Sequence, residues 1–261
     1  MNQSNGTLDD PLREALRLIA LADERGLSLR LMGGLAFHAR APEWTARIDR
    51  ARRDIDLATS GKHRKGVADL LVSSGYLPDK QYNALYGHKQ LYFVDPQFDR
   101  PVDVLVDRLE MCHTFEFGDR LTVDHPTLPL ADLLLSKLQV VKINRKDVLD
   151  ALILLAEHAL ADSDREGISV PRITAHTSSD WGWWRTVTGN LEKLRLFVEV
   201  ELKPEELDVG RPFRFDPHAQ VDALHSAIDA APKSTKWKLR SRVGDRVPWY
   251  QEPEEVGHGR E

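Results

Sequence analysis

Cysteine and long hydrophobic runs are what this chain of 261 residues most clearly lacks. Cys112 is the single cysteine, so an internal disulfide is excluded. The longest apolar run, Ala151 to Ala156, lies between Asp150 and Glu157 and is too short to span a bilayer. No secretory signal sequence is recognisable, and we therefore expect a cytoplasmic protein with no membrane segment.

A surplus of positive charge is also lacking, because the formal net charge is −5. This balance argues against a protein that coats nucleic acid through bulk charge. Two stretches are nevertheless locally basic, and each is either an ordinary solvated face or a surface for polyphosphate or RNA. The first contains Arg40, Arg47, Arg50, Arg52, Arg53, Lys62, Arg64 and Lys65, and the second contains Lys137, Lys142, Arg145 and Lys146 with no acid among them.

What is present is enough apolar sequence for a sizeable core. Hydrophobic residues make up 41% of the chain and charged residues 30%, as in soluble globular proteins. The length fits one large domain or two small ones.

The stretch from Ser28 to Leu57 carries the clearest local signal. Leu29 to Met32 is typical of a short buried strand, Gly33 and Gly34 interrupt it, and Leu35 onward has helical spacing. Two glycines at a strand-to-helix turn let the backbone approach a ligand, and the N–H groups that open the helix have no partners in it. The pattern predicts a phosphate site, although most such turns are only turns.

Three acids in strand-like sequence are the second signal. In Asp54-Ile55-Asp56, alternation predicts both carboxylates on one face of a strand. Asp103 lies in a second predicted strand, in which Val102, Val104 and Val106 would share the opposite face. An acid pair of this kind is often a solvated strand face, but paired carboxylates also suit a divalent metal, and an acid on so apolar a strand needs a reason.

Gly33-Gly34, Asp54-x-Asp56 and Asp103 together resemble the nucleotidyltransferase superfamily typified by DNA polymerase β. Two later stretches narrow the resemblance to the AbiEii/MenT group of toxins from type IV toxin–antitoxin systems. They are Leu130-Ala-Asp-Leu-Leu-Leu-Ser-Lys-Leu-Gln and Arg145-Lys-Asp-Val-Leu-Asp-Ala-Leu. The resemblance implies an α+β nucleotidyltransferase fold, with a twisted mixed sheet and flanking helices.

The resemblance also implies roles for individual residues. Asp54, Asp56 and Asp103 would hold Mg²⁺, and Lys137 and Asp147 would complete the catalytic set. Gly33, Gly34, Arg53 and Lys137 would bind the nucleotide. From composition alone, Lys137 is equally a lysine that extends from a packed stem to water, and Asp147 an acid favoured by the dipole at a helix start.

The remaining sequence predicts a change in the type of structure after residue 160. We expect a nucleotidyltransferase core over residues 1–160 and a helical region with an extended tail over 161–261. Residues 76–94 suggest a hairpin that turns at Gly87, and Ala161 to Pro171 suggests a linker. The run Trp181-Gly-Trp-Trp would either stack nucleobases or pack in the core, and Trp249 and Tyr250 suggest a tail docked on the body.

The function predicted from the sequence is metal-dependent transfer of NMP from an NTP to an acceptor hydroxyl. The resemblance favours RNA as acceptor, most specifically the 3′ end of tRNA, and a toxin with a cognate antitoxin protein as partner. The alternatives are a nucleotidyltransferase that modifies protein, and a catalytically silent relative that binds RNA or a partner protein.

Overall fold

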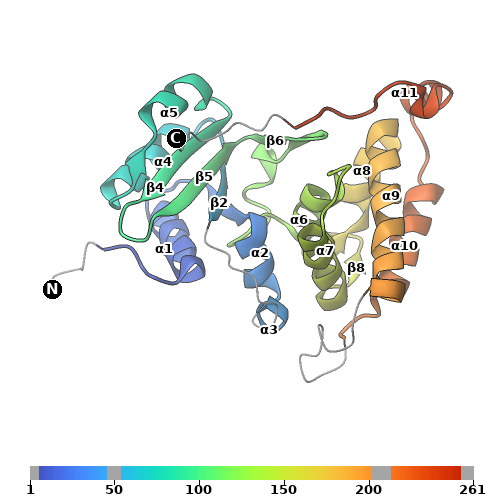
Figure 1. Cartoon of the computed structure of the whole chain (residues 1–261), viewed down its shortest axis with the longest axis horizontal. Helices are drawn as coiled ribbons and strands as arrows, with labels where there is room; N and C mark the ends of the chain where they lie inside the picture. The colour runs from blue at the N-terminus through green and yellow to red at the C-terminus, as the bar shows by residue number, and fades with distance from the viewer. Residues whose placement is uncertain (1–5, 46–53, 202–212, 254–261) are drawn as a thin grey trace.

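A mixed sheet of five strands organises the first half of the protein (Figure 1). The structure is a computed structural model that describes residues 6–45, 54–201 and 213–253. The strands are β1 (Leu29–Met32), β2 (Ile55–Thr59), β3 (Leu77–Pro78), β4 (Gln90–Asp95), β5 (Arg100–Val106), β6 (Arg108–Glu110), β7 (Thr114–Glu116), β8 (Leu160–Ala161) and β9 (Ile168–Ser169). The helices are α1 (Pro11–Glu24), α2 (Gly33–Arg40), α3 (Pro42–Thr45), α4 (Arg64–Ser73), α5 (Lys80–Tyr86), α6 (Leu130–Leu138), α7 (Arg145–Glu157), α8 (Val170–Ser179), α9 (Trp181–Leu196), α10 (Pro217–Ala230) and α11 (Thr235–Ser241).

The sheet has the strand order β1-β2-β5-β4-β3, in which β2 and β5 are parallel and the other neighbours antiparallel. Strand β5 alternates as the sequence predicts, because Val102, Val104 and Val106 are buried and Asp103 is partly exposed. Helices α1 and α2 pack on β1 and β2, and α1 also contacts α4. The apolar face of the sheet is thus in the core, and the face with Asp103 is free to carry polar groups.

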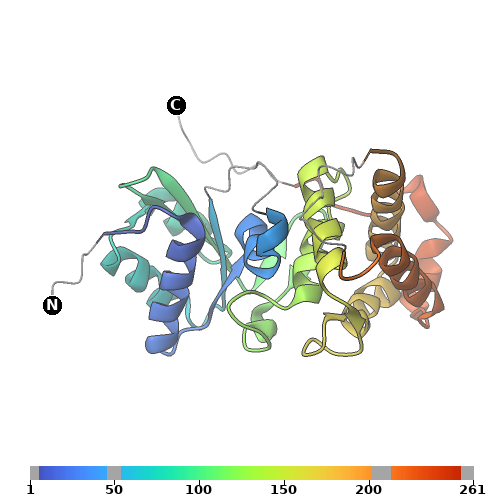
Figure 2. The same cartoon turned by 90° about the horizontal axis from the view of Figure 1, so that it is seen from below.

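The helical second half stacks against this core along the long axis of the molecule, as Figure 2 shows. Helices α6 and α7 pack against α2, and α8, α9 and α10 pack on α6 and α7 in turn. One continuous cluster of buried apolar side chains includes residues as distant as Leu18, Leu133 and Leu191. The predicted α+β class, with a mixed sheet, flanking helices and a helical C-terminal region, is confirmed.

Two local predictions are wrong. Residues 76–94 are not a simple hairpin, because α5 lies between β3 and β4, although these strands do pair antiparallel. Asp79 caps that helix by accepting a hydrogen bond from the Tyr82 N–H at 2.8 Å. The predicted linker contains the short parallel pair β8 and β9 and the start of α8, where Ser169 is the cap.

The tail after α11 docks on the body, as the sequence predicts. In Figure 1 this dark red segment crosses from the helical half back toward β6. The Trp249 indole N–H donates to the Thr186 hydroxyl at 3.0 Å, and the Gln251 N–H donates to the Cys112 carbonyl at 3.0 Å. We call residues 248–253 the strap. No helix in the described ranges is both long and apolar enough to cross a membrane.

Candidate active site

Asp56 and Asp103 lie side by side on the polar face of the sheet. They are register partners on the parallel strands β2 and β5. Neighbouring strands are about 4.8 Å apart, so the two carboxylates are close enough to bind one cation. Both side chains are partly exposed, whereas Ile55 and Val104 on the other face are fully buried. The alternation that suggested a paired acid site therefore places these two residues together.

The first residue of α2 packs directly against Asp56. Gly33 has φ +62°, and a Cβ at this position would lie 1.8 Å from Asp56 Oδ2. Glycine is needed here both for the left-handed backbone and for the contact. Gly34 follows in the first turn of α2, and Met32, the N-cap residue, supplies no side-chain hydrogen bond to it. The predicted glycine turn thus meets the predicted acids at a helix N-terminus, where anions are favoured.

Asp54 is exposed and lies just outside β2, which begins at Ile55. The expectation that Asp54 and Asp56 share a strand face is therefore not met. The physical reason is that β1 pairs with β2 only as far as Met32 opposite Asp56, after which Gly33 turns the chain into α2. Asp54 is close to the acid pair in sequence, but it lies before the first residue of β2 and outside the hydrogen-bonded pairing of the strands.

Strand β4 and helix α5 add side chains that sequence reasoning missed. The Gln90 side-chain amide donates a hydrogen bond to Asp103 Oδ1. Tyr92 is the register partner of Asp103 on the antiparallel strand, and the Tyr82 ring meets the Tyr92 ring edge to face with centroids 6.2 Å apart. Burial, followed by the negative charge of Asp103, raises the pKa of Tyr82. A prediction of the β4–β5 register would have been needed to find them.

These side chains open into a cleft of about 810 Å³. Its lining comes from Asp56 and Asp103 on the sheet, from α5, from β6 and from the strap. The lining residues are Asp56, Tyr82, Leu85, Tyr86, His88, Lys89, Gln90, Asp103, Leu105, Arg108, Leu109, Glu110, Met111, Gln251, Glu252 and Pro253. Lys89 and Arg108 both form ion pairs with Glu110 at the rim. The lining of the cleft thus combines acids, cations and aromatic rings.

The donor set of this cleft suits a hard divalent cation in part. Carboxylate oxygens are ligands that Mg²⁺ prefers, and Mg²⁺ commonly completes its shell with waters and substrate phosphates. Within the ranges that the structure describes, no three His, Cys, Asp or Glu side chains are arranged to hold a metal ion. Asp56 and Asp103 could therefore supply two oxygen ligands, and Asp54 is the nearest acid in sequence that could supply a third.

Lys137 and Asp147 form a second group on α6 and α7. Lys137 Nζ lies 2.6 Å from Asp147 Oδ1 and 3.2 Å from Asp150 Oδ2, and Asp150 is buried. The same ammonium group lies 5.4 Å from the ring centroid of Phe37, which is one turn along α2 from Gly33. The structure thus brings Lys137 together with Asp147, and α2 joins this group to the one at Asp56. Arg53 lies outside the described residues.

The tryptophan run is mostly packing. Trp181 and Trp183 are 5% and 6% exposed, and Trp183 stacks on His113 with centroids 4.9 Å apart. By contrast, the basic residues at the start of α7 are open to solvent. These are Lys142, Arg145 and Lys146.

Comparison with known proteins finds no matching family model and no matching curated protein. Several solved structures are similar. An antigenic nucleotidyltransferase-like protein from Paracoccidioides brasiliensis is 15% identical, with a TM-score of 0.42 and coverage of 88% of this chain and 97% of its own. ANT(2")-Ia in complex with adenylyl-2"-tobramycin is 17% identical, with a TM-score of 0.37 and coverage of 54% and 86%. JHP933 from Helicobacter pylori is 13% identical, with a TM-score of 0.35 and coverage of 91% and 97%. Likenesses this distant carry no argument about chemistry, which has to come from the site.

Proposed function

We propose that this protein is a metal-dependent nucleotidyltransferase. The observation that carries the proposal is the pair of register partners Asp56 and Asp103 facing a cleft, with the glycine start of α2 packed against Asp56. A helix N-terminus favours phosphate, and adjacent carboxylates favour a divalent cation. Nucleotidyl transfer needs both within a few ångströms of each other.

The proposed reaction moves a nucleoside monophosphate from an NTP to an acceptor hydroxyl. The hydroxyl oxygen forms a bond to the α-phosphorus, the bond from that phosphorus to the bridging oxygen of the β-phosphate breaks, and pyrophosphate leaves. The hydroxyl proton passes to a carboxylate, for which Asp103 is the proposed base. The Gln90 side-chain amide donates a hydrogen bond to Asp103 Oδ1 and so holds the carboxylate in place.

Mg²⁺ is the proposed cofactor, held by Asp56 and Asp103 with Asp54. When bound, it would neutralise the charge that develops on the attacking and leaving oxygens. Gly33 and Gly34 contribute the N–H groups at the start of α2 to the triphosphate. Lys137 is proposed to offset triphosphate charge, with Asp147 and Asp150 orienting its ammonium group.

RNA is the proposed acceptor, and the 3′ end of tRNA the most specific form of the proposal. The exposed cations Lys142, Arg145 and Lys146 support it, because a polynucleotide backbone is bound chiefly through phosphate neutralisation. A toxin with a cognate antitoxin is the corresponding biological role. It derives from the resemblance of the Lys137 and Asp147 helices to the AbiEii/MenT group.

The test is incubation of the purified protein with each labelled NTP and Mg²⁺, with tRNA, total RNA and protein extract offered separately. We expect label on RNA, and loss of labelling in Asp56→Asn and Asp103→Asn. Label on protein alone would overturn the acceptor and leave the chemistry intact. Absence of transfer with every NTP and acceptor, in protein of normal stability, would overturn the enzyme and favour the silent relative.

A further inference from the structure

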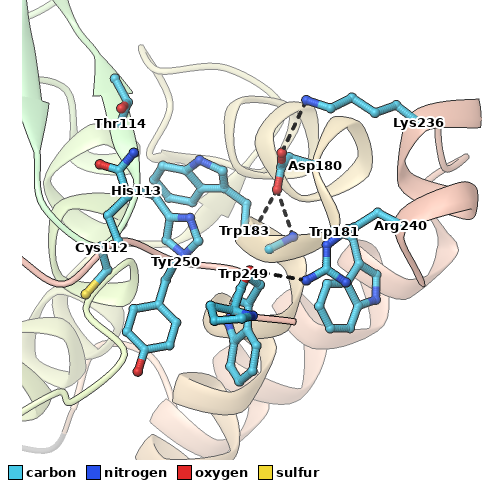
Figure 3. A pocket seen from close by; sticks show the side chains of 13 residues that line it. Cys112, His113, Thr114, Asp180, Trp181, Trp183, Lys236, Arg240, Trp249 and Tyr250 are labelled. Atoms are coloured by element: carbon cyan, nitrogen blue, oxygen red, sulfur yellow. Dashed lines mark hydrogen bonds and ion pairs between the residues drawn. The ribbon is translucent and has the colours of Figure 1, made fainter. Parts of the chain in front are cut away.

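A second cavity of about 520 Å³ is lined in part by the strap, which also lines the acidic cleft (Figure 3). It lies among the loop before β7, the start of α9, helix α11 and the strap. Its lining residues are Cys112, His113, Thr114, Asp180, Trp181, Gly182, Trp183, Lys236, Arg240, Pro248, Trp249, Tyr250 and Gln251. We call it the aromatic pocket.

Aromatic rings form the walls of this pocket. Trp181 and Trp249 meet edge to face, with ring centroids 6.0 Å apart and an interplanar angle of 82°. Trp249 and Tyr250 meet at 5.4 Å and 68°. Trp249 and Tyr250 are only partly buried, so their rings offer flat apolar surface to a ligand. A nucleobase stacks on such surfaces without regard to its identity.

Two cationic side chains, Lys236 and Arg240, line the pocket. Lys236 is exposed, and its Nζ lies 3.6 Å from Asp180 Oδ2. The guanidinium of Arg240 lies 4.6 Å from the Trp181 ring centroid and donates to the Val247 carbonyl at 2.7 Å. Between positions 233 and 246 the chain has six basic residues and one acid, although its net charge is −5. Lys236 and Arg240 bring part of this surplus to the aromatic walls, where it complements a phosphate backbone.

The strap joins the aromatic pocket to the acidic cleft. Gln251 lines both cavities, Trp249 lies in the pocket, and Glu252 lies in the cleft. Three residues of extended chain span roughly 10 Å, so the two cavities are near neighbours. A single strand with one base in the pocket can therefore place its next units toward Asp103.

The pocket wall is fixed by a close approach of backbone to backbone. A Cβ at Gly182 would lie 2.5 Å from the Trp249 carbonyl oxygen, so only glycine lets the strap lie flat on the start of α9. Asp180 accepts the Gly182 N–H at 2.7 Å and caps the same helix turn. The strap is thus held in one position rather than resting loosely on the surface.

We infer that the aromatic pocket binds a nucleobase of a single-stranded RNA and so holds the strand beside the acidic cleft. The binding itself stands on the pocket alone. Its role as a subsite for the acceptor rests on the proposed nucleotidyl transfer.

The experiment titrates the full chain with a short single-stranded RNA homopolymer, without NTP or metal, and follows tryptophan fluorescence. We expect saturable quenching, and a dissociation constant roughly five- to a hundred-fold higher for Tyr250→Ala, which removes one stacking surface. Lys236→Glu should weaken binding and reduce its salt dependence. The matched control is Phe215→Ala, an aromatic side chain 36% exposed outside the pocket, which should bind as the wild type does.

Three outcomes would overturn the inference. They are the absence of quenching, equal affinity of Tyr250→Ala and wild type, and a mononucleotide that binds as tightly as the strand. Gly182→Ala provides a second variant, because it displaces the strap and should weaken RNA binding even if Tyr250 proves hard to replace. Failure of transfer with binding retained would count against the proposed function and not against the pocket, because the titration involves no turnover.

Discussion

At the scale of single residues, the contact between Gly33 and Asp56 gives the sharpest prediction. Gly33→Ala adds a Cβ 1.8 Å from Asp56 Oδ2 at a backbone with φ +62°. The substitution must strain the backbone and displace the carboxylate, so we expect a loss of about 1–3 kcal/mol in unfolding free energy. We also expect transfer activity to fall at least about a hundred-fold, since a misplaced ligand forfeits several kcal/mol of charge stabilisation.

Gly26→Ala is the matched control for this prediction. Gly26 has φ +67°, but nothing lies within 4 Å of its added Cβ. Gly26→Ala should lower the unfolding free energy, as measured by denaturant unfolding. It should leave the transfer activity, as measured by pyrophosphate release, unchanged. Equal loss of activity in both variants would mean that Gly33 acts through stability and not through Asp56.

Lys137 illustrates how structure changes a prediction made from sequence. The sequence suggests that Lys137→Ala would weaken NTP use and leave the fold intact. The structure places its ammonium 3.2 Å from Asp150 Oδ2, and the side chain of Asp150 is 1% exposed. Removing the lysine therefore takes a cation away from a buried carboxylate, and we expect Lys137→Met to cost about 3 kcal/mol.

A double variant separates the two roles of Lys137. Lys137→Met with Asp150→Asn removes the buried charge together with its partner and should recover most of the stability. NTP binding, measured by calorimetry, should stay weak in the double variant. Recovery of NTP binding together with stability would show that the lysine is structural alone.

At the scale of elements, the buried His113 and the half-buried His176 make the packing of β7 on α8 and α9 sensitive to acid. Burial lowers the pKa of His113 to about 4, opposed by the charge of Asp180. Burial, with Arg172 and Arg120 nearby, lowers the pKa of His176 to about 4. In the unfolded chain both pKa values return to about 6.5. The unfolded state then binds more protons between pH 6.5 and 4, so stability is lost as pH falls through this window.

The measurement is the unfolding free energy at pH 7 and pH 4.5. We expect a loss of a few kcal/mol in the wild type, and a clearly smaller loss in His113→Phe and in His176→Leu. An unchanged pH dependence in both variants would place the acid sensitivity elsewhere in the molecule.

Elements with strong local patterns could be predicted from the sequence, and those that depend on register could not. Strand β5 follows from its β-branched alternation, and α9 follows from the capping Asp180, which accepts the Gly182 and Trp183 N–H groups. Helix α5 was missed because its seven residues lie between two strands of the same antiparallel pair. In such a stretch a turn signal at Gly87 suggests a hairpin first.

The candidate site divides in the same way. The proposed ligands Asp56 and Asp103 could be selected because an acid on an apolar strand is conspicuous in sequence. Gln90 and Tyr92 could not, because their place beside Asp103 depends on the antiparallel register of β4, which no local pattern encodes. The contribution of the strap residues to the cleft could not be predicted either, because the chain after α11 has to cross from the helical half back to the sheet to reach it.

At the scale of the whole molecule, one core runs through both halves. The side chain of Asp132 on α6 is fully buried and accepts from Arg120 at 2.9 Å and from Arg172 on α8 at 2.8 Å. Asn190 on α9 donates to the Leu138 carbonyl at 2.8 Å. The bonds made by Arg172 and Asn190 cross the boundary at residue 160 that the sequence suggested between 1–160 and 161–261.

We therefore expect the full chain to unfold in a single transition, with calorimetric and van't Hoff enthalpies equal. A fragment of residues 1–160 would lose Arg172, one of the two cations that pair with the buried Asp132, and would expose the apolar faces of α6 and α7 to water. The fragment should show no cooperative transition by calorimetry, and co-expression with residues 161–261 should restore one. A fragment that melts cooperatively on its own would instead establish two independently stable domains, with the acidic cleft complete apart from the strap.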